Sequence, residues 1–127
     1  MGAENVMARP AILVIDDETA IRGLFQEVLE GWGYAVDTAP TGQAGLELFR
    51  QKRYDVVLTD YLMPGITGFE VALTVQRENP GTPVILITGS ANDDQLTAAQ
   101  RCNITVLCKP VPLAELKVAV SQATHAP

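Results

Sequence analysis

The chain has 127 residues, of which 47% are hydrophobic types and 19% are charged, and its formal net charge is -6. This length allows one domain with a substantial buried core, and the composition excludes an intrinsically disordered acidic chain, which would be poor in aliphatic residues. The acidic balance disfavours direct binding to DNA or RNA, and no apolar run approaches the roughly 20 residues of a membrane-spanning helix.

Five short apolar runs are spaced along the chain and predict five strands. Most of these runs are continuous and rich in β-branched residues, which is typical of strands that are buried on both faces of a sheet. The second run instead alternates apolar and polar residues. The predicted strands cover residues 11–15, 34–38, 55–59, 83–87 and 104–107.

Each predicted strand is followed by a segment with apolar residues at helical spacing. The clearest stripe runs from Ile21 through Leu24 to Leu29 and is closed by two glycines. Thr67 and Glu70 form a capping box at the start of the third helical segment. Helices are predicted around residues 21–29, 44–49, 67–76, 93–101 and 112–120, the last with Leu113, Leu116 and Val120 on its apolar face.

The alternation of strands and helices, repeated five times, predicts a doubly wound α/β fold. Such a fold has a five-stranded parallel sheet with helices on both faces. We expect one domain over residues 11–123, with short tails over residues 1–10 and 124–127. In sheets of this kind ligands bind beyond the carboxyl ends of the strands, so the residues that follow each strand are the candidates for a site.

Polar residues stand directly after four of the five predicted strands. Asp16 and Asp17 follow the first, Asp60 the third, Thr88 the fourth and Lys109 the fifth. Three carboxylates at one edge repel each other, so the fold requires a counter-charge. Oxygen ligands without histidine or cysteine suit Mg²⁺, with Mn²⁺ as a substitute. A carboxylate beside Mg²⁺, a lysine and a hydroxyl is typical of a phosphoryl-transfer site in which the carboxylate is the nucleophile.

Each of these residues taken alone has an ordinary structural explanation. An aspartate after a strand, such as Asp17, is commonly the N-cap of the next helix. The segment 88–90 is also typical of a turn, and a lysine before a proline is common on surfaces. Chance rarely places all of them in order at one edge of a sheet, and this coincidence favours a functional site.

The histidine and cysteine content narrows the chemistry further. His125 is the only histidine and lies two residues from the end, which excludes a catalytic serine triad, a histidine-rich metal site and an internal phosphohistidine. Cys102 and Cys108 are too few for a disulfide scaffold and wrongly spaced for zinc. Residues 1–10 lack the apolar stretch of a signal peptide, so we expect a cytoplasmic protein without membrane insertion.

Four motifs give the sequence its resemblance to the receiver domains of two-component response regulators. They are V-I-D-D-E at 14–18, D-Y-L-M-P-G-I-T-G at 60–68, I-T-G at 87–89 and C-K-P at 108–110. Together they are highly specific, and the resemblance extends over about residues 11–123. It implies a flavodoxin-like (βα)5 fold.

The resemblance also implies roles for the residues at the predicted site. Asp60 is the implied acceptor of a phosphoryl group from a sensor histidine kinase or a histidine phosphotransfer domain. Asp17 and Asp60 are implied as direct Mg²⁺ ligands, with Asp16 binding through water and the backbone carbonyl of Leu62 as a further ligand. Lys109 is implied as the partner of the phosphate.

The family's switch and output follow from the same resemblance. Thr88 is implied as the hydroxyl that signals phosphorylation to a partner-binding face, and the Lys109–Pro110 peptide bond is implied to be cis. The resemblance implies that a downstream effector protein or domain binds that face. The chain is then not an enzyme in its own right, because it catalyses only its own phosphorylation and dephosphorylation.

Two positions depart from the family's usual pattern. Val106 stands where the family usually has an aromatic residue that swings inward on activation, which puts that swing in doubt. Leu62 stands where a polar residue is common, two positions after the acceptor, and it bears on the lifetime of the phosphate. Neither position is among the five polar residues of the predicted site.

Three other functions compete with this interpretation. A small aspartyl-phosphate phosphohydrolase usually carries a second aspartate two residues after the nucleophile, where this chain has Leu62. A nucleotide-binding flavodoxin-like module would place a Gly- or Ser/Thr-rich loop where the acidic segment 16–18 stands. An adaptor receiver that is not phosphorylated would have no use for the complete set of site residues.

We expect either a stand-alone regulator or a piece of a larger protein such as a hybrid kinase.

Overall fold

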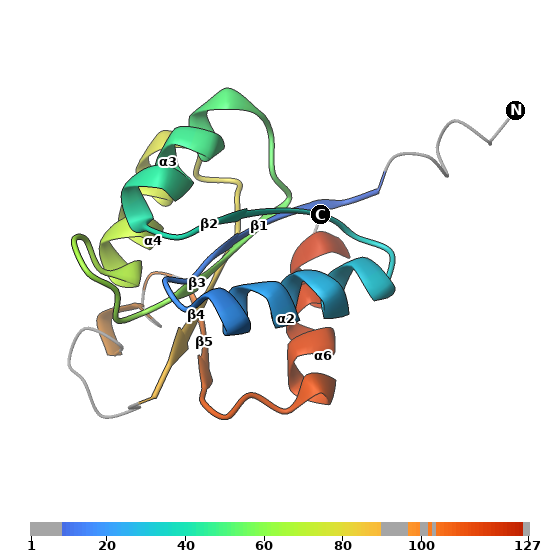
Figure 1. Cartoon of the computed structure of the whole chain (residues 1–127). Coiled ribbons are helices and arrows are strands. Elements are labelled where there is room, and N and C mark those ends of the chain that lie inside the picture. The colour runs from blue at the N-terminus through green and yellow to red at the C-terminus, as the bar shows by residue number, and fades with distance from the viewer. Residues whose placement is uncertain (1–8, 90–96, 100–101, 103, 126–127) are drawn as a thin grey trace, which may run out of the picture.

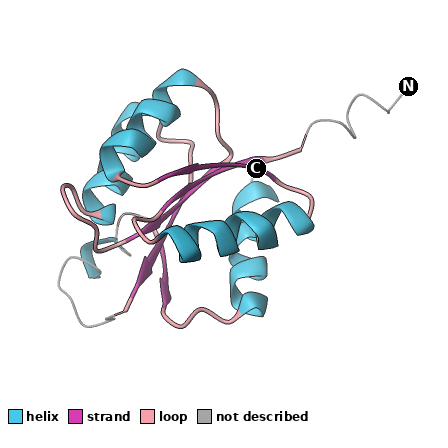
Figure 2. Cartoon of the chain, in the orientation of Figure 1, coloured by secondary structure: helices cyan, strands magenta, loops and turns pink. Residues whose placement is uncertain are grey.

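The computed structural model describes residues 9–89, 97–99, 102 and 104–125. Helices and strands alternate along most of this chain (Figures 1 and 2). They are β1 (Ala11–Ile15), α2 (Thr19–Gly31), β2 (Ala35–Ala39), α3 (Gly42–Gln51), β3 (Val56–Asp60), α4 (Gly68–Glu78), β4 (Val84–Thr88), β5 (Thr105–Cys108) and α6 (Leu113–His125). Residues 97–99 are helical, and most of the predicted helix over 93–101 lies outside the described residues.

The five strands form one parallel sheet in the order β2-β1-β3-β4-β5, which confirms the predicted doubly wound α/β fold. Helices α3 and α4 cover one face of the sheet, and α2 and α6 cover the other (Figure 1). Strand β1 lies between β2 and β3, so the chain reverses its direction of winding beside β1. The carboxyl ends of β1 and β3 are therefore neighbours at the edge where ligands bind in such sheets.

The strand residues alternate between two cores, one on each face of the sheet. Leu13, Val57 and Leu86 pack with the side chains of α3 and α4. Ile12, Leu58 and the other residues of opposite parity pack with α2 and α6. Every residue of β3 and β4 is buried, which explains why their sequences are continuous apolar runs rather than alternating patterns.

The strand bounds differ from the prediction by one residue in four of the five strands. β3 and β4 end on the polar residues Asp60 and Thr88, which were expected to lie just outside them. Backbone pairing sets these ends, because Asp60 still pairs with Ile87 and Thr88 with Cys108 in the parallel ladder. An apolar pattern marks where side chains are buried and does not show where the ladder stops.

Two leucines that were predicted to lie on buried helix faces are instead half exposed. Leu24 is 50% exposed and Leu113 is 51% exposed. Both line a groove between α2 and the segment that follows β5, together with Phe25 and Val111. Residues such as Leu29 and Leu116 fill the positions of these helices that face the sheet. Leu24 and Leu113 therefore lie farther from the sheet, at the edge of the groove.

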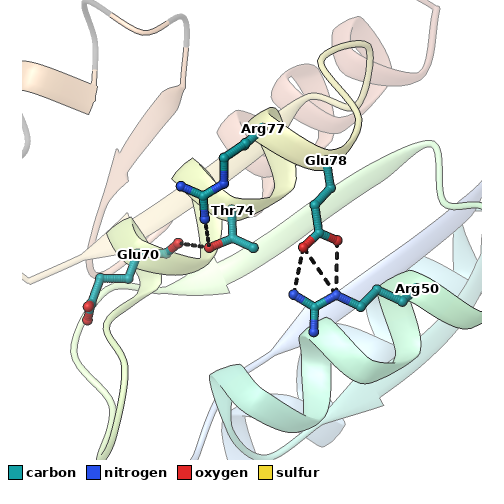
Figure 3. Close-up of polar contacts among 5 residues, drawn as sticks. All are labelled: Arg50, Glu70, Thr74, Arg77 and Glu78. Carbon is teal, nitrogen blue, oxygen red and sulfur yellow. Dashed lines mark hydrogen bonds and ion pairs between the residues drawn. The ribbon is translucent and has the colours of Figure 1, made fainter.

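A surface ion pair joins α3 and α4, the two helices on the opposite face of the sheet from α2 and α6. Two nitrogens of Arg50 in α3 donate hydrogen bonds to the Glu78 carboxylate of α4, with Nη2 at 2.6 Å from Oε2 (Figure 3). The hydrogen bonds and charge of this pair lower the pKa of Glu78 and raise that of Arg50. Both groups lie on the surface and away from the strand ends that carry the predicted site.

Candidate functional site

The three predicted carboxylates meet at the carboxyl edge of the sheet. Oxygen atoms of Asp16, Asp17 and Asp60 all lie within 4.8 Å of one another. Asp16 and Asp60 are buried, with 2% and 6% exposure, while Asp17 is exposed. The structure therefore brings together acidic residues that are 43 (Asp17 and Asp60) and 44 (Asp16 and Asp60) positions apart in the sequence.

The loop from β1 to α2 places Asp16 and Asp17. The backbone N–H of Asp16 donates to the carbonyl of Ala39 at 3.1 Å, and its Oδ1 accepts from the N–H of Glu18 at 2.9 Å. The helix N-cap is Glu18, without a side-chain capping bond. The ordinary explanation of Asp17 as an N-cap is therefore wrong, and its carboxylate is left to face the cluster.

The loop from β3 to α4 places Asp60. The N–H of Tyr61 continues the ladder to Ile87 at 2.8 Å, and the N–H of Gly68 donates to the carbonyl of Tyr61 at 2.7 Å. A Cβ atom on residue 68 would lie 2.0 Å from the backbone oxygen of Asp60, so only glycine fits. The capping box of Thr67 begins α4 directly after this contact, as its sequence predicted.

Lys109 makes the one described ion pair with the cluster. Its Nζ lies 2.9 Å from Oδ1 of Asp60, and its backbone N–H donates to the carbonyl of Thr88 at 2.7 Å. Burial alone would lower the pKa of Lys109, but its hydrogen bond to Asp60 and the neighbouring negative charges outweigh burial and raise it. Lys109 is therefore a firmly charged cation beside Asp60. The Lys109–Pro110 bond is cis, which confirms that expectation.

Burial sets the electrostatics of Asp16. It raises the pKa of this carboxyl, the hydrogen bond from the Glu18 N–H lowers it, and the charges of Asp60 and Asp17 raise it again, with Lys109 opposing them. The net direction is upward. Two further carboxylates beside a buried one are costly in the absence of positive charge.

The remaining predicted residues surround this cluster. Thr88 is 2% exposed and ends β4, one position after the residue that pairs with Asp60. Leu62 is 69% exposed, so its side chain points away from the core. Val106 pairs with Leu86 and packs at the margin of the core under α3 and α4.

The donor set fits a hard divalent cation. Three carboxylates offset by one lysine leave two negative charges, and every side-chain donor in the cluster is an oxygen. Mg²⁺ prefers such ligands and binds through one or two carboxylates with the remaining positions left to water and substrate oxygens. The site is poorly suited to zinc, because no histidine or cysteine belongs to the cluster.

Arg22 is a residue of the site that the sequence did not reveal. Its guanidinium Nη1 donates to the backbone carbonyl of Asp16 at 2.8 Å. An arginine six residues after an acidic pair is too common on helices to be singled out by spacing. The only usable signal was its place in the first turns of the helix that follows the acidic loop.

Residues 12–121 match the family described as the response regulator receiver domain. The chain is 34% identical over 113 residues to the transcriptional regulatory protein ZraR of Klebsiella oxytoca, a match that covers 88% of this chain and 26% of ZraR. It therefore spans about a quarter of that relative's length.

Solved structures show the same likeness. A receiver domain protein from Clostridium thermocellum has a TM-score of 0.86 and 33% identity, over 91% of this chain and 94% of the other. The response regulator TrrA from Thermotoga maritima, in complex with Mg²⁺–BeF, has a TM-score of 0.82 and 34% identity, over 90% of this chain and 98% of the other.

Among the described residues, no helix has the length and apolar content needed to cross a bilayer.

Proposed function

The chain belongs to the response regulator receiver domain family, and on that premise we propose that Asp60 accepts a phosphoryl group from a phosphohistidine. The observation that carries the proposal is the meeting of three carboxylates within 4.8 Å, with Lys109 at 2.9 Å from Asp60. Asp60 ends β3, where the ladder and the contact with Gly68 hold its backbone. A fixed nucleophile loses little freedom on reaction.

Asp17 and Asp60 would hold Mg²⁺ directly, with the backbone carbonyl of Leu62 as a third ligand and Asp16 acting through water. Mn²⁺ would bind as a substitute. When bound, the cation offsets the negative charge of the carboxylates and of the incoming phosphoryl oxygens. The related structure that holds Mg²⁺–BeF supports this assignment, because it shares 34% identity over 90% of this chain.

The chemical step is a transfer between two nucleophiles. A carboxylate oxygen of Asp60 forms a bond to phosphorus while the P–N bond of phosphohistidine breaks. The imidazole nitrogen keeps the bonding electron pair and takes up a proton from water. Lys109, a charged cation beside Asp60, moves its ammonium toward the phosphoryl oxygens and neutralises charge there.

Phosphorylation would be signalled through Thr88. Its hydroxyl is buried near the end of β4, and a new phosphoryl oxygen beside it shifts an equilibrium between two conformations. Val106 carries no aromatic ring that could swing into space vacated by Thr88. The signal in this chain would therefore pass through repacking of a small apolar side chain.

The partners follow from this chemistry. A sensor histidine kinase or a histidine phosphotransfer domain supplies the phosphoryl group, and an effector protein or domain reads the phosphorylated face. The chain acts on its own Asp60 and is not an enzyme that turns over a substrate. We place this exchange in the cytoplasm, without direct contact with nucleic acid or insertion into a membrane.

A phosphohydrolase is the less favoured alternative. It would require a second acid to protonate the leaving group, and the position two residues after Asp60 holds the exposed hydrocarbon of Leu62. An adaptor that is never phosphorylated is disfavoured because Lys109 and three clustered carboxylates have no structural need to lie together.

A small phosphodonor such as acetyl phosphate tests the proposal without the native kinase. Incubated with Mg²⁺, the parent chain should gain the mass of one phosphoryl group, and EDTA should prevent the gain. Asp60→Asn should gain nothing, while Asp55→Asn, at the opposite edge of the sheet, should behave as the parent. Equal labelling of the parent and of Asp60→Asn would contradict the proposal.

A further inference from the structure

Arg22 lies in the second turn of α2 and reaches back to the loop that carries the acidic cluster. Its backbone N–H donates to the carbonyl of Glu18 at 2.9 Å, which fixes the residue in the helix. Its half-buried side chain donates Nη1 to the carbonyl of Asp16 at 2.8 Å. A bond from a charged donor is stronger than one between neutral groups.

The carbonyl that Arg22 holds belongs to the peptide group between Asp16 and Asp17. A peptide group is planar, so a fixed oxygen fixes the plane in which the chain enters Asp17. On the amino side of this peptide group, the hydrogen bond from the Asp16 N–H to the Ala39 carbonyl holds the chain. On its carboxyl side, the hydrogen bond from the Glu18 N–H to Oδ1 of Asp16 holds the chain. Arg22 thus completes the restraint of the loop at its centre.

Asp17 depends on this restraint more than the other two carboxylates do. Asp16 accepts a hydrogen bond from Glu18, and Asp60 is paired with Lys109. Within the described residues no hydrogen bond or ion pair holds the Asp17 carboxylate, which is exposed. Its place within 4.8 Å of Asp60 is therefore set by its backbone position and its own rotamer, without a hydrogen bond to its carboxylate from the described residues.

We propose that Arg22 is a positioning residue of the divalent-cation site, which holds the Asp16–Asp17 peptide group so that the Asp17 carboxylate stays beside Asp60. The role rests on the proposed function, because only a bound cation requires Asp17 at that place. Arg22 touches neither the cation nor the phosphoryl group and acts through the backbone. Residues that orient a metal ligand typically change metal affinity by about 10- to 100-fold when removed.

Three variants separate this role from a general effect of charge or stability. Arg22→Met keeps an unbranched apolar stem and removes the donor, whereas Arg22→Lys keeps a charged donor. Arg77→Met is the matched control, because Arg77 is also a helix arginine. Its side chain contacts Thr74 at 3.5 Å (Figure 3). Arg77 is the last residue but one of α4, whereas Asp60 lies beside Gly68 at the start of that helix.

Mn²⁺ is the probe, and the electron paramagnetic resonance signal of the free ion measures its binding. Arg22→Met should raise the dissociation constant about tenfold, and Arg77→Met should leave it within about twofold of the parent value. Arg22→Lys should recover most of the affinity. A residue that merely stabilised the fold would lower the melting temperature and leave the dissociation constant of the folded protein unchanged.

A second measurement follows phosphorylation by acetyl phosphate as Mg²⁺ is varied. In Arg22→Met the Mg²⁺ concentration at half-maximal rate should rise by the same factor, with the maximal rate close to that of the parent. If Arg22→Met does not fold, Arg22→Gln replaces it, because glutamine is too short to reach the carbonyl; a raised dissociation constant supports the proposal and an unchanged one overturns it.

The outcomes distinguish this proposal from the function on which it rests. If the parent binds Mn²⁺ and Arg22→Met binds it equally well, the positioning role is overturned and the cation site stands. If the parent does not bind Mn²⁺ more tightly than Asp60→Asn does, both are overturned. Weakened binding in Arg22→Met with recovery in Arg22→Lys supports the role.

Discussion

Replacing Asp60 with asparagine should stabilise the metal-free fold, although Asp60 is the central residue of the proposed site. In Asp60→Asn the amide replaces a carboxylate of almost the same size. The oxygens of Asp60 and Asp16 lie within 4.8 Å, where two charges repel by about 3.5 kcal/mol at an effective dielectric constant near 20. Asp17 is exposed, so water screens its repulsion to about 1 kcal/mol.

The variant also loses an attraction. Lys109 lies 2.9 Å from Asp60 with its side chain 36% exposed, which limits this attraction to about 3 kcal/mol at an intermediate dielectric constant. The asparagine oxygen can still accept the hydrogen bond from Nζ. The balance predicts that Asp60→Asn raises the free energy of unfolding by about 1–2 kcal/mol in EDTA.

Bound Mg²⁺ should narrow this difference in stability between the parent and Asp60→Asn. At ten times its dissociation constant a ligand stabilises the folded state by about 1.4 kcal/mol, and this gain should be smaller in Asp60→Asn because a ligand is lost. Denaturant unfolding followed by far-UV circular dichroism, in EDTA and in Mg²⁺, measures both effects. Glu27→Gln removes an equal charge from the exposed face of α2 and should change stability by less than about 0.5 kcal/mol. A less stable Asp60→Asn in EDTA would refute the reasoning.

Three further predictions concern residues around and away from the site. Leu62→Asn should speed phosphate loss by about three- to tenfold, because a polar side chain beside the acceptor can orient the attacking water, whereas the matched variant Leu73→Asn on α4 should not; equal or slower loss in Leu62→Asn would contradict this. Tyr54 donates to Asp37 at 2.7 Å and lowers the pKa of that carboxyl, so the stabilisation is present above the unfolded pKa near 3.8 and is lost as pH falls through the lower folded pKa. Tyr54→Phe should therefore reduce the free energy of unfolding at pH 7 by about 1 kcal/mol, and the difference should shrink below about pH 4; a difference that persists at pH 2 would count against it. Trp32 follows α2 at the edge opposite the strand carboxyl ends, so its fluorescence should barely respond to Mg²⁺, and strong quenching would disagree with this placement.

The fold was largely predictable because its three central strands, β1, β3 and β4, are buried on both faces. Runs such as those of β3 and β4 leave little choice of secondary structure, and the alternation with helices then favours a parallel sheet. Helix faces were less predictable. Leu24 and Leu113 fit the apolar stripes of their helices, yet each lines a groove and is half exposed. Helical spacing shows which residues share a face, but it does not show how much of that face the neighbouring element covers.

The meeting of the carboxylates was predictable from topology, and its details were not. Strand ends in a parallel sheet share one edge, so Asp16, Asp17 and Asp60 were expected together. The place of Lys109 at that edge followed from the same argument, whereas its ion pair with Asp60 is known from the structure. The contact from Arg22 to the Asp16 carbonyl depends on a loop conformation and a rotamer, and no spacing rule encodes either.

The chemical identity of the labelled residue is the most direct test of Asp60 as the acceptor. The parent chain is phosphorylated with acetyl phosphate and Mg²⁺, and the acyl phosphate is reduced with borohydride, which converts a phosphorylated aspartate to homoserine. Peptide mass spectrometry then locates the change in the sequence. The structure predicts homoserine at position 60, at the end of β3, and unchanged aspartates at positions 16 and 17. Homoserine at another position, with Asp60 intact, would contradict the assignment.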